Sequence, residues 1–215
     1  MDNFEGNRVD AAGGQELPPD CGSIYGEYLP ELEAVRQHLL GEIETIRRDM
    51  KEETGFDPVE HCLSRIKSEE SMREKCRRRG LPETTQSALT RLYDAVGIRV
   101  ICAFLQDVYA IRDRLTVLPD IEVAEEKDYI RRAKPNGYRS LHLILRVKGF
   151  YAEIQLRTIS QDTWAALEHQ MRYKKDIGGN TALIGEELKR CADELASTDI
   201  SMQTIRDMIW NNKEG

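Results

Sequence analysis

The chain has 215 residues, of which 40% are hydrophobic and 32% charged, and its formal net charge is −7. This balance is typical of a globular protein and excludes a disordered or collagen-like chain. No apolar run approaches the roughly 18 residues that a membrane-spanning helix needs, so we expect no membrane partner. The length suits one domain with helical extensions.

The first residues and the cysteines both point to one compartment. The N-terminal stretch MDNFEGNRVD is acidic and lacks the apolar core of a signal peptide. The five cysteines are scattered, odd in number and form no Cys-x-x-Cys pair, which favours reduced thiols over a disulfide or zinc framework. We therefore expect a cytoplasmic protein.

Basic residues gather in two places in this acidic chain. From Arg65 to Arg79 there are seven basic residues against three acidic ones. A second group comprises Arg131, Arg132, Lys134 and Arg139. The net negative charge argues against nucleic acid as a partner, and two local cationic patches indicate a small polyanion such as a nucleotide.

The first third of the chain is predicted to be helical after a tail. Residues 1–22 are rich in Gly, Pro, Asp and Asn, and we expect a flexible tail there. Apolar residues at steps of three and four predict one amphipathic helix over 24–50. A second helix is expected over 69–79, with Ser68 as its N-cap and Gly80 as its stop.

Strand patterns follow in the middle of the chain. Four segments have the residue content of strands: 95–104, 120–130, 141–147 and 150–158. The last two flank Lys148-Gly149, which predicts a hairpin. Helices are expected over 160–175 and, as a final pair, over about 182–212. This order favours an α+β or mixed α/β fold, with helices around a largely antiparallel sheet.

The hairpin has one aliphatic side and one polar side. A two-residue loop makes His142 face Gln155 and puts Glu153 and Arg157 on the same side of the sheet. A solvated outer face would also produce such a row. A Glu beside a Gln and a His is also the set of groups that binds a metal and takes a proton from a hydroxyl.

The predicted helix over 69–79 carries a possible phosphate site. Ser71, Lys75 and Arg78 lie at i, i+4 and i+7 and share one face, and Arg65 and Lys67 precede the helix. Helix N-termini and cations both bind phosphate well. A solvated charged face explains the same spacing, so the two interpretations stay open.

Two charges border or interrupt the first predicted strand. Asp94 lies at the entrance of the segment 95–104, and Arg99 lies within it. A charge inside an apolar strand must reach the surface of the sheet or find a partner. Asp94 alone is a weak metal signal, since a single Asp is more often a cap or turn residue.

Five motifs together resemble the synthetase domain of RelA/SpoT-type proteins, in the same order: RIKSEESMREK, YDAVGIRV, KPNGYRSLH, AEIQLRT and WAALEHQMRYK. The resemblance runs from about residue 60 to 175 and suits the single-domain small alarmone synthetases. It implies a nucleotidyltransferase-like mixed sheet with helices on both sides. The synthetase domain would span 23–179, and 180–215 would be helices for packing or oligomerisation.

The activity that the resemblance implies is Mg²⁺-dependent transfer of the pyrophosphate of ATP to the 3′-hydroxyl of GDP or GTP, giving (p)ppGpp and AMP. Because no His-Asp hydrolase motif is present, it implies synthesis without hydrolysis. It also implies a homotetramer formed through the terminal helices. The segment VEHCLS before Arg65 differs from the loop associated with alarmone stimulation, which leaves an allosteric site open.

The resemblance also assigns residues. Asp94 and Glu153 would serve Mg²⁺, with Glu153 activating the acceptor hydroxyl. The ATP-binding set would be Arg65 and Arg99 around adenine, and Lys67, Ser71, Lys75 and Arg78 at the phosphates. The GTP/GDP-binding set would be Tyr138 stacked on guanine, with Lys127, Lys134, His142 and Gln155. Arg139 receives no role.

Three other interpretations compete with this one. A toxin-type relative would place pyrophosphate on the 3′ end of tRNA, which the net charge of −7 disfavours. A catalytically silent nucleotide-binding regulator would need neither Asp94 nor Glu153. A helical scaffold protein would show no magnesium dependence.

Overall fold

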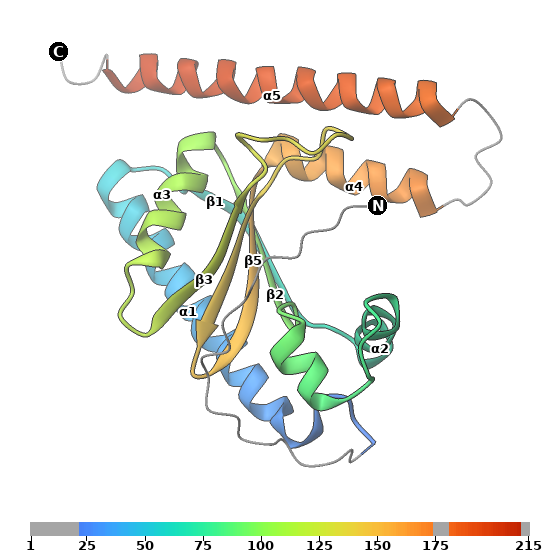
Figure 1. The fold of residues 1–215 in the computed structure, drawn as a ribbon. Helices are drawn as coiled ribbons and strands as arrows, with labels where there is room; N and C mark the ends of the chain where they lie inside the picture. The colour runs from blue at the N-terminus through green and yellow to red at the C-terminus, as the bar shows by residue number, and fades with distance from the viewer. Residues whose placement is uncertain (1–21, 174–180, 212–215) are drawn as a thin grey trace.

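The computed structural model describes residues 22–173 and 181–211, so the predicted tail over 1–22 lies almost wholly outside the described residues. The elements in chain order are η1 (Gly26–Tyr28), α1 (Leu29–Thr54), β1 (Val59–Ile66), α2 (Glu69–Arg78), η2 (Ser87–Arg91), β2 (Val96–Cys102), α3 (Leu105–Thr116), β3 (Ile121–Asp128), β4 (Leu141–Val147), β5 (Phe150–Thr158), α4 (Ile159–Tyr173) and α5 (Thr181–Asn211) (Figure 1). None of the described helices is long and apolar enough to cross a membrane.

Five strands form one sheet in the order β1-β2-β5-β4-β3. Strands β2 and β5 run parallel, whereas β1–β2, β5–β4 and β4–β3 are antiparallel. The parallel pair requires a crossover, which α3 begins and the strands β3 and β4 complete. The fold class expected from the sequence, a mixed sheet flanked by helices, is confirmed.

One face of the sheet carries the core. Its centre consists of six fully buried residues of β4 and β5: Leu141, Leu143, Leu145, Ala152, Ile154 and Leu156. Helices α1 and α3 pack against this face (Figure 1). The apolar stripe predicted for the first helix is buried there, and comprises Leu32, Val35, Leu39, Ile43, Ile46 and Met50. Each fully buried aliphatic side chain contributes roughly 1.5–3 kcal/mol.

The β4–β5 hairpin has the predicted register, in which His142 pairs with Gln155. Lys148 and Gly149 form its turn with φ angles of 52° and 87°. Two positive φ values are what a tight two-residue hairpin turn requires. Because side chains alternate along each strand, this register turns Glu153, Gln155 and His142 away from the core.

The C-terminal segment corrects one prediction, because α5 is a single continuous helix over Thr181–Asn211 and not a helical pair. The Ser/Thr-rich stretch at its centre favours a break on sequence grounds. Thr198 and Ser201 instead donate their hydroxyls to the carbonyls of Glu194 and Ser197, four residues earlier. Such bonds let these residues remain inside a helix.

Two further elements differ from the sequence interpretation. The segment before Arg65, expected to be a loop, is the edge strand β1, which pairs with β2. Helix α3 was not predicted, although its buried residues Val108, Ile111 and Leu115 have helical spacing. Helix α5 lies across α4 and the end of the sheet (Figure 1).

Candidate active site

The polar face of the sheet forms a cavity of about 160 Å³. Its lining comes from β1, β2, β5 and the segments that precede α2 and β2: Leu63, Ser64, Arg65, Lys67, Asp94, Gly97, Ile98, Arg99, Glu153 and Gln155. Most of the residues that the sequence assigned to ATP and to metal therefore lie in one place. The central position of β2 between β1 and β5 brings them together.

Strand register explains the floor of the cavity. Arg65 pairs with Gly97, and Gly97 pairs with Glu153, so the three positions form one row across β1, β2 and β5. Gly97 contributes no side chain, and a Cβ built there would lie 3.9 Å from the Arg65 carbonyl oxygen. No side chain therefore covers the backbone in the middle of this row.

Two arginines border one half of the cavity. Arg99 pairs with Leu63, which makes Arg65 and Arg99 diagonal neighbours on antiparallel strands. Diagonal positions are separated by about 7–8 Å, which leaves room for a planar ring between two guanidinium groups. Burial lowers the pKa of Arg99, and the charge of Arg157 lowers it further.

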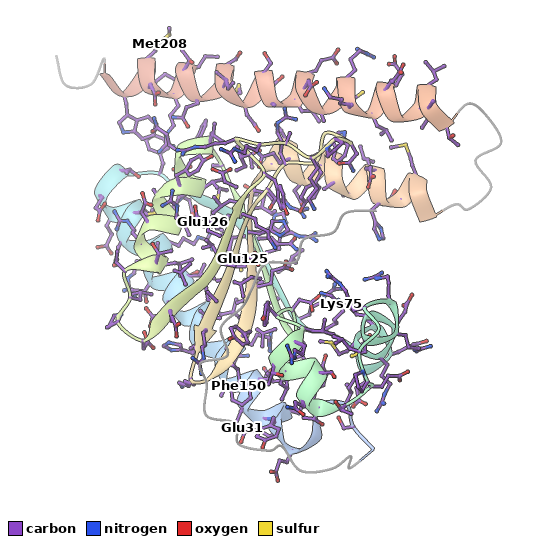
Figure 2. The ribbon with its side chains drawn as sticks, in the orientation of Figure 1. Glu31, Lys75, Glu125, Glu126, Phe150 and Met208 are labelled. Carbon is purple, nitrogen blue, oxygen red and sulfur yellow. The ribbon has the colours of Figure 1, made fainter. Side chains whose placement is uncertain are left out.

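Asp94 binds two lysines through one oxygen. Its Oδ2 accepts from Lys75 Nζ at 2.7 Å and from Lys67 Nζ at 2.9 Å. Lys75 comes from α2, beside the sheet (Figure 2). Burial raises the pKa of Asp94, but the hydrogen bonds from Lys75 and Lys67 outweigh it and leave that pKa below its usual value. The other oxygen, Oδ1, is buried without a hydrogen-bond partner.

Glu153 is fixed by its neighbours on β4 and β5. Its Oε1 lies 3.2 Å from His142 Nδ1, and Oε2 accepts from Gln155 Nε2 at 3.0 Å. Burial raises the pKa of Glu153, but His142 and Gln155 outweigh this effect, and the pKa is lowered. Glu153 is therefore a carboxylate at neutral pH.

The donor set suits a metal held jointly with a substrate. Within residues 22–173 and 181–211, no group of three or more His, Cys, Asp or Glu side chains could hold a metal ion alone. Mg²⁺ is usually bound by one or two carboxylates together with substrate phosphates. Asp94 and Glu153 are close enough for the charge of Asp94 to act on Glu153, and Asp94 Oδ1 is free to bind.

A hydrogen-bonded chain extends from Glu153 to Tyr138. The Tyr138 hydroxyl lies 2.9 Å from His142 Nε2 and accepts from Arg157 Nη2 at 2.6 Å. The imidazole tautomer with its proton on Nδ1 satisfies every group, since Nδ1 donates to Glu153 and Nε2 accepts from Tyr138. Arg157 also donates to Gln155 Oε1 at 2.9 Å.

Arg157 is the residue of this cluster that the sequence interpretation missed. The hairpin pattern places it on the polar face but gives it no role. It is only 4% exposed, so it is a buried charge among otherwise half-buried groups. The polar face of the predicted hairpin indicated that Arg157 lies on the side of Glu153 and Gln155. It could not predict that the Arg157 side chain is buried.

Two further lysines lie on the Tyr138 side. Lys134 Nζ is 4.4 Å from the ring centroid of Tyr129 and 4.9 Å from that of Tyr138. Burial lowers the pKa of Lys134. Lys127 faces His142 across β3 and β4 and pairs with Glu125 at 2.9 Å. The predicted acceptor residues are thus grouped on β3, β4, β5 and the segment between β3 and β4.

Ser71 and Arg78 do not line the cavity. Both are exposed on α2. Ser71 Oγ accepts from the N-capping residue Ser68 at 2.8 Å. The Ser68 cap itself is as predicted, because its side chain accepts from the Ser71 backbone N–H. Of the three residues predicted on one face of this helix, Lys75 alone contacts Asp94.

Arg139 ties the turn before β4 to α5. Its guanidinium donates to Asp193 at 3.0 Å and to the Gly137 carbonyl at 3.2 Å. Gly137 has a φ of 92°, and a Cβ there would lie 2.7 Å from the Cβ of Ala192. Only glycine fits that conformation and that approach. Arg139 therefore has a structural contact outside the cavity.

Comparison with known proteins places this site in a family. The model of the region found in RelA / SpoT proteins matches residues 64–178, which include every lining residue of the cavity except Leu63. The chain belongs to the RelA/SpoT family. The resemblance carried by the five motifs is thereby confirmed.

Similar proteins support the same placement of this RelA/SpoT protein. It is 41% identical over 163 residues to GTP pyrophosphokinase YwaC of Bacillus subtilis (strain 168), covering 72% of this chain and 77% of that one. The crystal structure of small alarmone synthetase 2 from Bacillus subtilis matches with a TM-score of 0.73 and 35% identity, covering 85% and 98% of the two chains. Small alarmone synthetase 1 from Bacillus subtilis, bound to its product pppGpp, matches with a TM-score of 0.73 and 27% identity, covering 85% and 95%.

Proposed function

We propose that this RelA/SpoT protein is a (p)ppGpp synthetase, which transfers the pyrophosphate of ATP to the 3′-hydroxyl of GDP or GTP. The observation that carries the proposal is the placement of Asp94 and Glu153 in one cavity, between a donor-side and an acceptor-side group of cations. The similarity to a GTP pyrophosphokinase and to a synthetase bound to pppGpp supports it.

The donor half of the cavity would hold ATP. Arg65 and Arg99 stack on the two faces of adenine, since guanidinium planes stack well on bases. Lys67 and Lys75 bind the phosphates. To do so they weaken the ion pairs that both make with Asp94 when no nucleotide is bound. Outside the cavity on α2, Arg78 would add a cation for the phosphates and Ser71 a hydroxyl group.

Asp94 and Glu153 would hold Mg²⁺ together with the ATP phosphates. A bound Mg²⁺ supplies charge neutralisation at the phosphates and lowers the pKa of a nearby hydroxyl. Glu153 accepts the proton of the 3′-hydroxyl at its carboxylate, while the 3′-oxygen forms a bond to the β-phosphorus and AMP leaves. His142 and Gln155 orient Glu153 for this proton transfer.

The acceptor residues, which lie beside the cavity on its Glu153 and Gln155 side, would hold the guanosine nucleotide. The ring of Tyr138 stacks on guanine, and Lys127 and Lys134 meet the acceptor phosphates. Arg157 and His142 fix the Tyr138 hydroxyl, so the ring is presented in one orientation. The presence of both Asp94 and Glu153 favours an enzyme over a silent regulator.

We also propose that the chain is a cytoplasmic homo-oligomer, with a tetramer as the expected state. Helix α5 exposes large apolar side chains that a second copy could cover: Leu183, Ile200, Met202, Ile205, Met208 and Ile209. Met208 points away from the body of the molecule (Figure 2). Five of the six lie within 200–209, and apolar exposure gathered in one stretch favours an association surface.

An acceptor assay tests the proposed activity. Purified protein is incubated with Mg²⁺, ATP labelled on its terminal phosphates, and GDP, GTP, GMP or tRNA in turn. Label transferred to a guanosine nucleotide alone supports the proposal. Transfer to tRNA, or transfer to none of the acceptors, would contradict it.

A further inference from the structure

Asp162, in the first turn of α4, contacts Arg99, which lines the cavity, and Arg157, which lies beside the cavity among the acceptor residues. Its Oδ1 lies 3.2 Å from Arg157 Nη1 and 3.5 Å from Arg99 Nη1. Arg99 stands on β2 in the donor half, and Arg157 stands on β5 among the acceptor residues. One carboxylate oxygen therefore links the cavity to the neighbouring acceptor residues.

The contact with Arg157 is the stronger of the two. The Arg157 side chain is 5% exposed, and a buried charge requires a partner of opposite charge. Asp162 supplies that partner, while the other guanidinium nitrogens donate to Tyr138, Gln155 and Ser140. The position of Arg157, and through it the position of the Tyr138 hydroxyl, depends on Asp162.

The contact with Arg99 is weaker. The distance from Arg99 Nη1 to Asp162 Oδ1 is longer than the corresponding distance from Arg157. The Arg99 side chain is 39% exposed, and its Nε is buried without a hydrogen-bond partner. Two guanidinium groups at one oxygen also repel each other, as the effect of Arg157 on Arg99 indicates. Arg99 is therefore the member of the trio that a ligand in the cavity can draw away at least cost.

We propose that Asp162 is a positioning residue that couples the two nucleotide sites, an inference that rests on the proposed function. When ATP engages Arg99, that guanidinium gives up its share of Asp162 Oδ1. Arg157 then has the carboxylate to itself and holds Tyr138 and Gln155 in place for the acceptor. ATP therefore tightens acceptor binding, and by linkage the acceptor tightens ATP binding equally.

The coupling is measured by calorimetry without turnover. The Kd of GDP is determined with and without AMPCPP, whose methylene bridge blocks the transfer, in the presence of Mg²⁺. For the wild-type chain we expect AMPCPP to lower the Kd of GDP about five-fold or more. For Asp162→Asn we expect the ratio of the two Kd values to fall to about one.

Asp193→Asn is the matched control, because it breaks the ion pair with Arg139 beside the acceptor turn but touches neither Arg99 nor Arg157. We expect it to keep the wild-type ratio. A purely structural role of Asp162 would weaken both binding events and leave their ratio unchanged. An unchanged ratio in Asp162→Asn, or a wild-type ratio of one, would overturn the inference.

A double variant covers the case in which Asp162→Asn fails to fold. Asp162→Asn leaves Arg157 as a buried charge without its partner, whereas Asp162→Asn with Arg157→Met removes both charges. The double variant should fold and show a ratio of about one; a wild-type ratio would again overturn the inference. If the wild-type chain makes no alarmone, the proposed function fails. If it makes alarmone but the ratio of GDP Kd values is unchanged in the Asp162 variants, only the coupling fails.

Discussion

Lys75 Nζ lies 2.7 Å from Asp94 Oδ2, and Lys67 Nζ approaches the same oxygen at 2.9 Å. This arrangement fastens α2 to the entrance of β2 through one half-buried carboxylate. Phosphate groups of a donor nucleotide would offer both lysines a second anion. Asp94 Oδ1, which is buried without a partner, would then face a metal ion without competition from Nζ groups.

Lys75→Met tests the donor side. A hydrogen bond to a charged group contributes about 1.5–3 kcal/mol, so the KM for ATP should rise about 10- to 150-fold. The KM for the guanosine nucleotide should change little, because none of the acceptor residues lies on α2. Lys51→Met, which alters an ion pair with Asp57 at the end of α1, is the matched control. Steady-state kinetics measure both KM values. Equal changes in the two would contradict the assignment of Lys75 to the donor nucleotide.

Tyr138→Ala and Tyr138→Phe separate the ring from the hydroxyl. Stacking on a base contributes roughly 1–3 kcal/mol, so Tyr138→Ala should raise the KM for the acceptor about 5- to 150-fold and spare ATP binding. Tyr138→Phe keeps the ring and loses the contacts with Arg157 and His142. It should leave the acceptor KM within about threefold of wild type if stacking dominates. Equal losses in both variants would assign the role to the hydroxyl.

From the raised pKa of Asp199 we predict that the stability of the folded chain changes with pH. Burial raises the pKa of Asp199, and the hydrogen bond from Thr158 Oγ1, 2.6 Å long, offsets only part of this. The carboxyl ionises more readily in the unfolded chain, so its contribution to folding is lost as pH rises through the folded pKa. Asp199→Asn removes the charge and keeps an acceptor for Thr158. The Tm at pH 7 should rise by about 1–3 °C.

The gain from Asp199→Asn should shrink on acidification. Because its pKa is raised, the carboxyl of the folded wild-type chain binds its proton before that of the unfolded chain does, so the two Tm values should converge as the pH falls from 7 toward 4. Scanning calorimetry at the two pH values measures the difference. A gain of the same size at both pH values, or a loss at pH 7, would contradict the pKa direction.

Met208→Glu tests the proposed association through α5. Met208 is 60% exposed, so the change should not affect the folded monomer, whereas a charge in an apolar interface is costly to desolvate. Sedimentation velocity should show a smaller species than the wild-type chain. Met208→Leu should sediment as wild type. The proposal fails if Met208→Glu keeps the wild-type assembly, or if the wild-type chain is already a monomer.

Local patterns predict the parts of this fold that depend on near neighbours. The hairpin register follows from its two-residue turn, and the turn alone is enough to place His142 opposite Gln155. The Ser68 cap likewise depends on residues three positions apart. The assembly of the cavity depends instead on pairing between β2 and β5, which are about fifty residues apart in sequence.

The missed elements have physical reasons. Strand β1 is an edge strand with one exposed face. Its polar residues Glu60, His61 and Arg65 interrupt the alternation of apolar and polar side chains that identifies a strand in sequence. The shared use of Asp162 by Arg99 and Arg157 depends on the direction in which α4 leaves β5. No spacing in the sequence encodes that direction.

Glu153→Gln is the most direct test of the central claim, that the carboxylates of this cavity perform pyrophosphate transfer. The change preserves shape and removes the charge that binds metal and accepts the proton. We predict that (p)ppGpp formation from labelled ATP falls about 10²- to 10⁴-fold, while the Kd of AMPCPP changes only slightly. Alarmone formation by Glu153→Gln at the wild-type rate would contradict the assignment of both base and metal ligand.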